Sequence, residues 1–141
     1  MTTGTGGQWA CDTSVAVPAL DPTHEAHDRC RPIVLETRPA LAGHAAFEAH
    51  SVLTRLPVPL RLSPELAAEV LARAFPDTCW LSPEEGEALR CELGEHRVIG
   101  GAVYDALVGR AADSAGRTLL TRDRRARATY ESLGIEYRFV D

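Results

Sequence analysis

The segment that decides the fold is RTLLTRDRRARATYESLGIEYRFV, residues 117–140. It begins with an apolar run, continues through a helix-forming stretch that Gly134 closes, and ends in a second apolar run. This order predicts a strand over 117–121, a helix over 124–133 and a final strand over 135–140. Strands and helices that alternate in this way build a parallel sheet covered by helices.

The rest of the chain continues this alternation. Further short strands are predicted over 8–11, 40–43 and 78–81. The helical spacing of apolar residues, together with Ser-Pro start signals and proline or glycine stops, predicts helices over 14–20, 24–35, 44–56, 64–75, 82–94 and 100–115. We therefore predict an α/β fold: one domain over 9–141, with a central parallel sheet flanked by helices on both faces. Residues 1–8, which are rich in Thr and Gly, are predicted to form a flexible tail.

Composition excludes several functions. The 141 residues carry a net charge of -5, and all 15 basic residues are arginine. A chain without lysine has no P-loop lysine and no Schiff-base chemistry. The net negative charge argues against a protein that coats nucleic acid through its overall charge, but it does not exclude a local basic patch. The sequence has no signal peptide and no apolar run of about 18 residues, so we expect a cytoplasmic protein without a membrane span.

The four cysteines fit no zinc-site spacing. Cys11 and Cys79 lie in apolar stretches and are predicted to be small core residues with reduced thiols.

Four carboxylates stand at positions where they could form a functional site. Asp12 and Asp123 follow predicted strands, and parallel sheets bind ligands beyond the carboxyl ends of their strands. Glu48 and Asp105 border the apolar faces of predicted helices, where a carboxylate needs a partner. Each residue also has an ordinary interpretation: Asp123 as a helix N-cap, Asp12 as a turn residue, and the other two as surface residues.

Few cations lie near Asp12, Glu48 and Asp105 in the sequence. At ~4 Å and an effective dielectric constant near 20, each carboxylate pair would repel by about 4 kcal/mol. A bound divalent cation removes that repulsion, and hard oxygen ligands select Mg²⁺ or Mn²⁺. Such a metal site would activate water against a phosphodiester.

The same acids stand in four short motifs that resemble those of PIN-domain ribonucleases. The motifs are DTS at 12–14, AAFEAHSVLTRL at 45–56, YDAL at 104–107 and LLTRD at 119–123. Their order and separation, over nearly the whole chain, are most similar to the VapC toxins of type II toxin–antitoxin modules. The resemblance implies a Mg²⁺- or Mn²⁺-dependent endoribonuclease that hydrolyses tRNA or rRNA, a cognate VapB-like antitoxin partner and a homodimer.

The resemblance also implies roles for residues of this chain. Asp12 and Asp105 would be the principal metal ligands and catalytic residues, and Glu48 and Asp123 would complete the site. Thr13, Ser14 and Thr121 would orient these carboxylates or a water molecule.

Arginine is concentrated beside the fourth acidic motif. Residues 105–141 carry more arginines than acids, whereas residues 1–104 are strongly acidic. We predict that the RNA backbone is bound by arginines of this segment, which are Arg122, Arg124, Arg125 and Arg127. A solvated helix face paired with nearby acids explains the same residues.

Two rival enzyme classes are disfavoured. A haloacid-dehalogenase phosphatase needs a second acid at position 14, where the chain has Ser14, and both that class and receiver domains need a lysine. The alternative that remains open is a PIN-like RNA-binding or RNA-processing domain without a toxin role.

Overall fold

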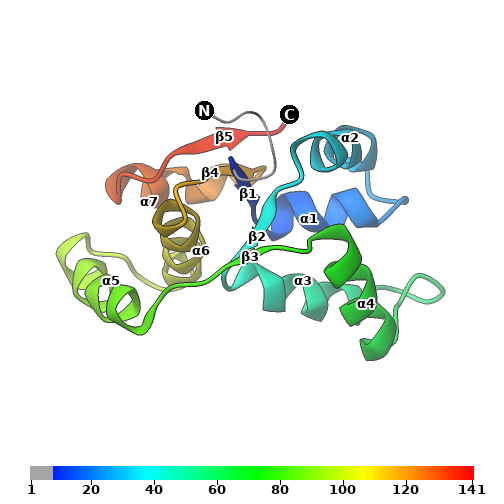
Figure 1. The fold of residues 1–141 in the computed structure, drawn as a ribbon, viewed down its shortest axis with the longest axis horizontal. Coiled ribbons are helices and arrows are strands. Elements are labelled where there is room, and N and C mark those ends of the chain that lie inside the picture. Colours follow the sequence, from blue (N-terminus) through cyan, green and yellow to red (C-terminus); the bar gives the residue numbers. More distant parts are fainter. Residues whose placement is uncertain (1–7) are drawn as a thin grey trace.

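The computed structural model describes residues 8–141, and a sheet of five parallel strands forms its centre (Figure 1). The strands are β1 (Trp9–Cys11), β2 (Ala40–Ala42), β3 (Thr78–Cys79), β4 (Thr118–Thr121) and β5 (Tyr137–Phe139). Their order across the sheet is β3-β2-β1-β4-β5, with every neighbouring pair parallel. Ala10 of the central strand pairs with Ala40 on one side and with Leu119 on the other. The predicted parallel α/β sheet is confirmed.

Helices cover both faces of the sheet, as predicted. They are α1 (Thr13–Leu20), α2 (His27–Thr37), α3 (Ala45–Leu53), α4 (Pro64–Ala74), α5 (Pro83–Glu95), α6 (Ala102–Ser114) and α7 (Arg127–Ser132). Figure 1 shows α1 to α4 on one side of the sheet and α5 to α7 on the other. Helix α1 packs on α2 and α3, and α6 packs on α5 and α7. The sheet is therefore the middle layer of three.

Side-chain caps explain where several helices begin. The Ser82 hydroxyl accepts a hydrogen bond from the Glu85 N–H, and the Glu85 carboxylate accepts one from the Ser82 N–H, which completes the predicted capping box. The Ser63 hydroxyl likewise accepts from the Leu66 N–H at the start of α4.

Several predicted helices differ from the observed ones at their ends: the helix predicted over 44–56 ends at Leu53, and two others differ for a reason that the structure shows. The helix predicted over 24–35 begins at His27, because Asp21 accepts hydrogen bonds from Thr23 and holds the preceding residues in a turn. It continues to Thr37 despite Pro32. The helix predicted over 124–133 begins as a 3₁₀ turn, η1 (Arg124–Ala126), capped by the Asp123 carboxylate.

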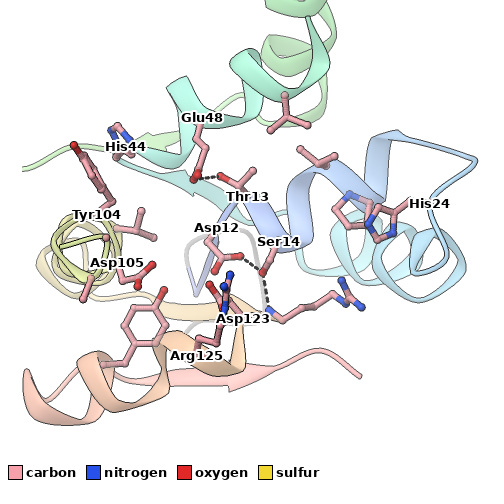
Figure 2. A pocket seen from close by; sticks show the side chains of 18 residues that line it. Asp12, Thr13, Ser14, His24, His44, Glu48, Tyr104, Asp105, Asp123 and Arg125 are labelled. Atoms are coloured by element: carbon pink, nitrogen blue, oxygen red, sulfur yellow. Dashed lines mark hydrogen bonds and ion pairs between the residues drawn. The ribbon is translucent and has the colours of Figure 1, made fainter. Parts of the chain in front are cut away.

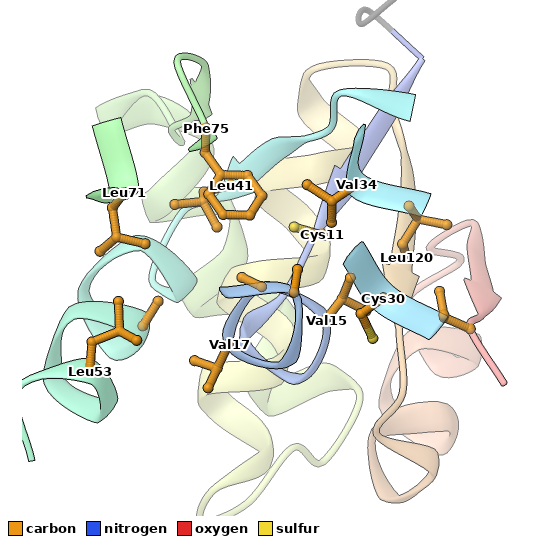
Figure 3. Packing of buried hydrophobic residues seen from close by; sticks show 14 of the residues in the cluster. Cys11, Val15, Val17, Cys30, Val34, Leu41, Leu53, Leu71, Phe75 and Leu120 are labelled. Atoms are coloured by element: carbon orange, nitrogen blue, oxygen red, sulfur yellow. The ribbon is translucent and has the colours of Figure 1, made fainter. Parts of the chain in front are cut away.

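Two apolar clusters hold the layers together, one on each side of the sheet. Figure 3 shows the first, in which Val15 and Cys11 pack with Leu53 and Phe75. Tyr130 and Leu89 belong to the second, beneath α6. The predicted core positions of Cys11 and Cys79 are confirmed, since both side chains are buried.

Of the predicted tail at residues 1–8, only Gln8 lies within the described residues. It is exposed, and its carbonyl accepts a hydrogen bond from the Thr118 N–H at 3.0 Å. None of the helices described between residues 8 and 141 is both long enough and apolar enough to cross a bilayer.

Gly109 lets α6 approach the Tyr130 ring closely. A Cβ atom at Gly109 would lie 3.0 Å and 3.1 Å from two ring carbons of Tyr130 and 3.2 Å from the Ile135 Cγ1 atom. We expect Gly109→Ala to lower the free energy of unfolding by about 1–3 kcal/mol, because the added methyl overpacks a filled core. Urea denaturation measures this change.

The matched control is Gly86→Ala in α5, where no atom lies within 4 Å of the new Cβ. There the better helix propensity of alanine should stabilise the protein by about 0.5–1 kcal/mol. Equal effects of the two substitutions would contradict the packing argument.

Candidate active site

A cavity of about 890 Å³ opens beyond the carboxyl ends of β1 and β4, and all four predicted acids line it (Figure 2). Asp12 follows β1 directly, and Asp123 lies two residues beyond β4. Glu48 comes from α3 and Asp105 from α6. At the end of β2, Gly43 takes a φ of +52°, a left-handed conformation that suits glycine, and turns the chain into α3. The ends of β1 and β4 and one face each of α3 and α6 thus surround a single cavity.

Asp12 is the most firmly held of the four acids. It is only 7% exposed, and hydroxyl groups donate to both of its carboxylate oxygens. The Ser14 hydroxyl donates to Oδ1 at 2.6 Å, and the Thr121 hydroxyl donates to Oδ2 at 2.5 Å. The backbone N–H of Arg122 donates to the Ser14 hydroxyl at 2.7 Å, which ties α1 to the segment after β4. Ser14 and Thr121 therefore stand where the sequence predicts orienting residues.

The other three acids are more accessible. The Thr13 hydroxyl donates to the Glu48 carboxylate at 2.8 Å across the gap between α1 and α3. Asp123 caps η1 by accepting from the Arg125 N–H, so its ordinary interpretation as an N-cap is also correct. Asp105 points toward the other acids from α6 (Figure 2). Glu48 itself is exposed, whereas Asp105 is half-buried.

The environment of the site disfavours the ionised forms of the Asp12 and Asp105 carboxyl groups. Burial raises the pKa of Asp12 to about 6, against the lowering effect of the Ser14 and Thr121 hydroxyls. Burial also raises the pKa of Asp105 to about 6, and the nearby charges of Asp123 and Glu48 add to the effect. Carboxyl groups with raised pKa values in a cleft are typical of functional sites.

The four predicted RNA-binding arginines separate into two pairs. Arg122 and Arg125 line the cavity. Arg125 is 94% exposed, and its Nε atom lies 3.4 Å from Asp123.

Arg124 and Arg127 do not line the cavity. Arg124 pairs with Asp141 at 2.6 Å and lies over the Phe139 ring, and Arg127 pairs with Glu131 at 3.0 Å. The interpretation of a helix face paired with nearby acids therefore describes these two residues.

Sequence reasoning missed three aromatic residues of the cleft. Tyr130, His44 and Tyr104 all line it. Burial raises the pKa of Tyr130, with the charges of Asp12 and Asp105 adding to the effect, so this phenol stays protonated at neutral pH. Tyr104 immediately precedes an acid in the YDAL motif, and this adjacency was the available signal. Nothing in the sequence marks His44 or Tyr130.

The donor set of the cleft fits a divalent cation. Carboxylate oxygens supported by hydroxyl groups are the ligands that Mg²⁺ and Mn²⁺ prefer. Between residues 8 and 141, however, no three Asp, Glu, His or Cys side chains stand close enough together to hold a single ion as they lie. The residue types fit, whereas the side-chain positions do not form a coordination shell.

A parallel α/β sheet with four acids gathered beyond its carboxyl edge is the arrangement that the resemblance to PIN-domain ribonucleases implies. No family model matches the chain. It is 47% identical to ribonuclease VapC27 of Mycobacterium tuberculosis over 126 residues, which cover 89% of this chain and 92% of the relative. It is 43% identical to ribonuclease VapC40 of the same species over 133 residues, covering 93% and 98% of the two chains.

Among solved structures, VapBC2 from Rickettsia felis, bound to a DNA fragment from its promoter, matches with a TM-score of 0.65. The match has 14% identity and covers 94% of this chain and 98% of that one. At this identity it shows the fold alone. On the identities above, the chain belongs to the VapC ribonuclease family.

Proposed function

We propose that this protein is a metal-dependent endoribonuclease toxin of a type II toxin–antitoxin module that hydrolyses phosphodiester bonds in tRNA or rRNA. The convergence of four carboxylates in one cavity carries the proposal. Within the described part of the chain, Asp123 is the one member of this set with an ion pair. The ribonuclease relatives support the reaction class.

In this proposal Asp12 and Asp105 are the principal metal ligands, and Glu48 and Asp123 complete the site directly or through water. When bound, Mg²⁺ or Mn²⁺ supplies Lewis acidity that lowers the pKa of water and offsets negative charge at the phosphate. The residue types in the cleft suit that role, and raised pKa values at Asp12 and Asp105 are consistent with carboxylates arranged for a cation.

The remaining residues of the cleft orient these ligands and bind the RNA backbone. Ser14 and Thr121 fix both oxygens of Asp12, and Thr13 restrains Glu48. Arg122 and Arg125 are the arginines placed to bind phosphate, since both line the cavity. Arg124 and Arg127 would first have to leave their carboxylate partners.

The proposal extends to partners and location. We expect a VapB-like antitoxin that blocks the cleft, a homodimer and a cytoplasmic location. The VapC relatives and the VapBC complex of the R. felis neighbour support the antitoxin partner. The free cysteines among residues 8–141 suit a reducing compartment.

The direct test is incubation of the purified protein with total RNA, with Mg²⁺ or with EDTA, followed by mapping of the new ends. We expect discrete cleavage of tRNA or rRNA with the metal and none with EDTA. Binding of RNA without any cleavage at added Mg²⁺ or Mn²⁺ would instead favour the non-toxin PIN-like alternative.

We expect the hydroxyl group of Thr121 to contribute more to RNA cleavage than the size of its side chain does. Thr121→Val keeps the shape but removes the donor to Asp12, so cleavage should fall by about 10–100-fold, as is usual for residues that support metal ligands. Initial rates of RNA cleavage measure the loss.

The matched control is Thr118→Val, which makes the same exchange at the other end of β4. It should leave the cleavage rate near that of the unsubstituted protein. An equal loss in both variants would show that the effect comes from the strand and not from the hydrogen bond.

A further inference from the structure

Two aromatic rings stand against each other at the edge of the acidic cleft. The rings of His44 and Tyr104 are stacked, with centroids 4.9 Å apart and planes inclined by 29°. Both residues line the cavity, and Figure 2 shows them side by side next to Asp105 and Glu48. His44 precedes α3, the helix of Glu48, and Tyr104 directly precedes Asp105 in α6. The ring pair thus bridges the two helices that bring acids from opposite sides.

The Tyr104 ring does not contribute to the core. It belongs to neither apolar cluster, and Tyr104 as a whole residue is 53% exposed although the His44 ring covers part of it. No hydrogen bond to its hydroxyl occurs within residues 8–141. The folded protein therefore presents an exposed aromatic surface in the cleft. Stacking on His44 fixes its orientation, and it takes no part in the apolar core.

We propose that the His44–Tyr104 pair is a stacking subsite for an unpaired nucleobase of the RNA, beside the phosphodiester that the acids address. The inference rests on the proposed ribonuclease function and narrows its substrate. A base within a duplex already has neighbours on both faces, so the subsite takes nucleotides from a loop, bulge or single strand. Stacking on a ring face tolerates any base, so the pair selects unpaired structure more than sequence.

The test separates RNA binding from cleavage. All variants are made in an Asp12→Asn background and measured in EDTA, so that neither cleavage nor metal is involved. The probes are a short single-stranded RNA with one 2-aminopurine and a blunt duplex of the same length. Affinity is followed by anisotropy, and stacking by quenching of the 2-aminopurine fluorescence.

We expect Tyr104→Ala to weaken binding of the single strand about tenfold and to reduce the quenching. Tyr104→Phe, which keeps the ring, should bind and quench like the background protein. Binding of the duplex should change little.

The matched control is Trp80→Ala. Trp80 is 55% exposed and packs against the tilted ring of Phe47 outside the cavity lining, so its loss removes comparable aromatic surface from another place. This variant should bind the single strand like the background protein.

Unchanged affinity and quenching in Tyr104→Ala would overturn the proposal. A loss of binding that accompanies a change of molecular mass would also overturn it, because a second copy of the chain would then cover the ring. If the unsubstituted protein cleaves RNA with Mg²⁺ while Tyr104→Ala binds normally, only the stacking inference fails. If no RNA is cleaved but the single strand is bound and quenched through Tyr104, the nuclease proposal fails and the subsite stands.

Discussion

Asp12→Asn and Asp105→Asn are each expected to reduce RNA cleavage by at least about a thousandfold, which corresponds to about 4 kcal/mol of transition-state stabilisation. Asparagine keeps the size of the side chain but removes the charge that a cation needs. Both proteins should stay folded, because burial already disfavours the charged form of each carboxyl group. Initial rates with Mg²⁺, together with circular dichroism and urea denaturation, measure the two effects.

Asp113→Asn is the matched control for Asp105. It makes the same exchange near the end of α6, where the partly exposed carboxylate pairs with Arg110 away from the cleft. Cleavage by this variant should remain near that of the unsubstituted protein. Full activity of both cleft variants would exclude the assignment of the acids as metal ligands.

The second large effect is a loss of stability with rising pH in metal-free protein. The carboxyl groups of Asp12 and Asp105 ionise near pH 4 in the unfolded chain but only near 6 in the folded protein, where burial raises both pKa values to about 6. Between pH 4 and 6 the unfolded state therefore binds fewer protons, and the free energy of unfolding falls as the pH rises. The difference between 3.8 and about 6 corresponds to about 3 kcal/mol for the buried Asp12.

Mg²⁺ should restore much of this stability at pH 7.5 and little at pH 5, where protons compete with the cation. Urea midpoints followed by tryptophan fluorescence, in EDTA and in Mg²⁺, test both effects. Hydrogen bonds from the Ser82 N–H and the Tyr137 hydroxyl hold the pKa values of Glu85 and Glu131 below their usual range, so these groups give a slope of the opposite sign.

Comparison with Asp12→Asn isolates the contribution of the cleft, since Glu85 and Glu131 are present in both proteins. The variant should lose less stability between pH 4 and 6 and should gain less from Mg²⁺. Identical pH profiles for the two proteins would contradict a raised pKa of Asp12 in the folded protein.

The sequence predicted the element order and the four acids of the cleft, because both are encoded locally. Alternating apolar runs and capped helices identify strands and helices, and a carboxylate just after a strand lies at the ligand-binding edge of a parallel sheet. Helix ends were less accurate. The hydrogen bonds of Asp21 decide that α2 begins at His27, and turn chemistry of this kind competes with helical spacing.

The positions of the four arginine side chains could not all be predicted from neighbouring residues in the sequence. All four lie in one short stretch, yet Arg122 and Arg125 reach the cleft while Arg124 and Arg127 bind Asp141 and Glu131 elsewhere. Arg124 and Arg125 are neighbours within η1, yet only Arg125 lines the cleft, and the partner of Arg124 is 17 residues away. The spacing of charges predicts the Arg127–Glu131 pair, which lies four residues apart on one helix, but it does not predict the other placements.

The sequence itself determined three features: the absence of lysine chemistry, the α/β alternation, and the placement of Asp12 and Asp123 after strands. Each of these depends on composition or on neighbouring residues. Only the tertiary structure decided that Thr121 donates to Asp12 across 109 positions and that Tyr104 stacks on His44 at the same cleft. Such contacts form between elements far apart in the chain, and their geometry depends on how the helices pack against the sheet.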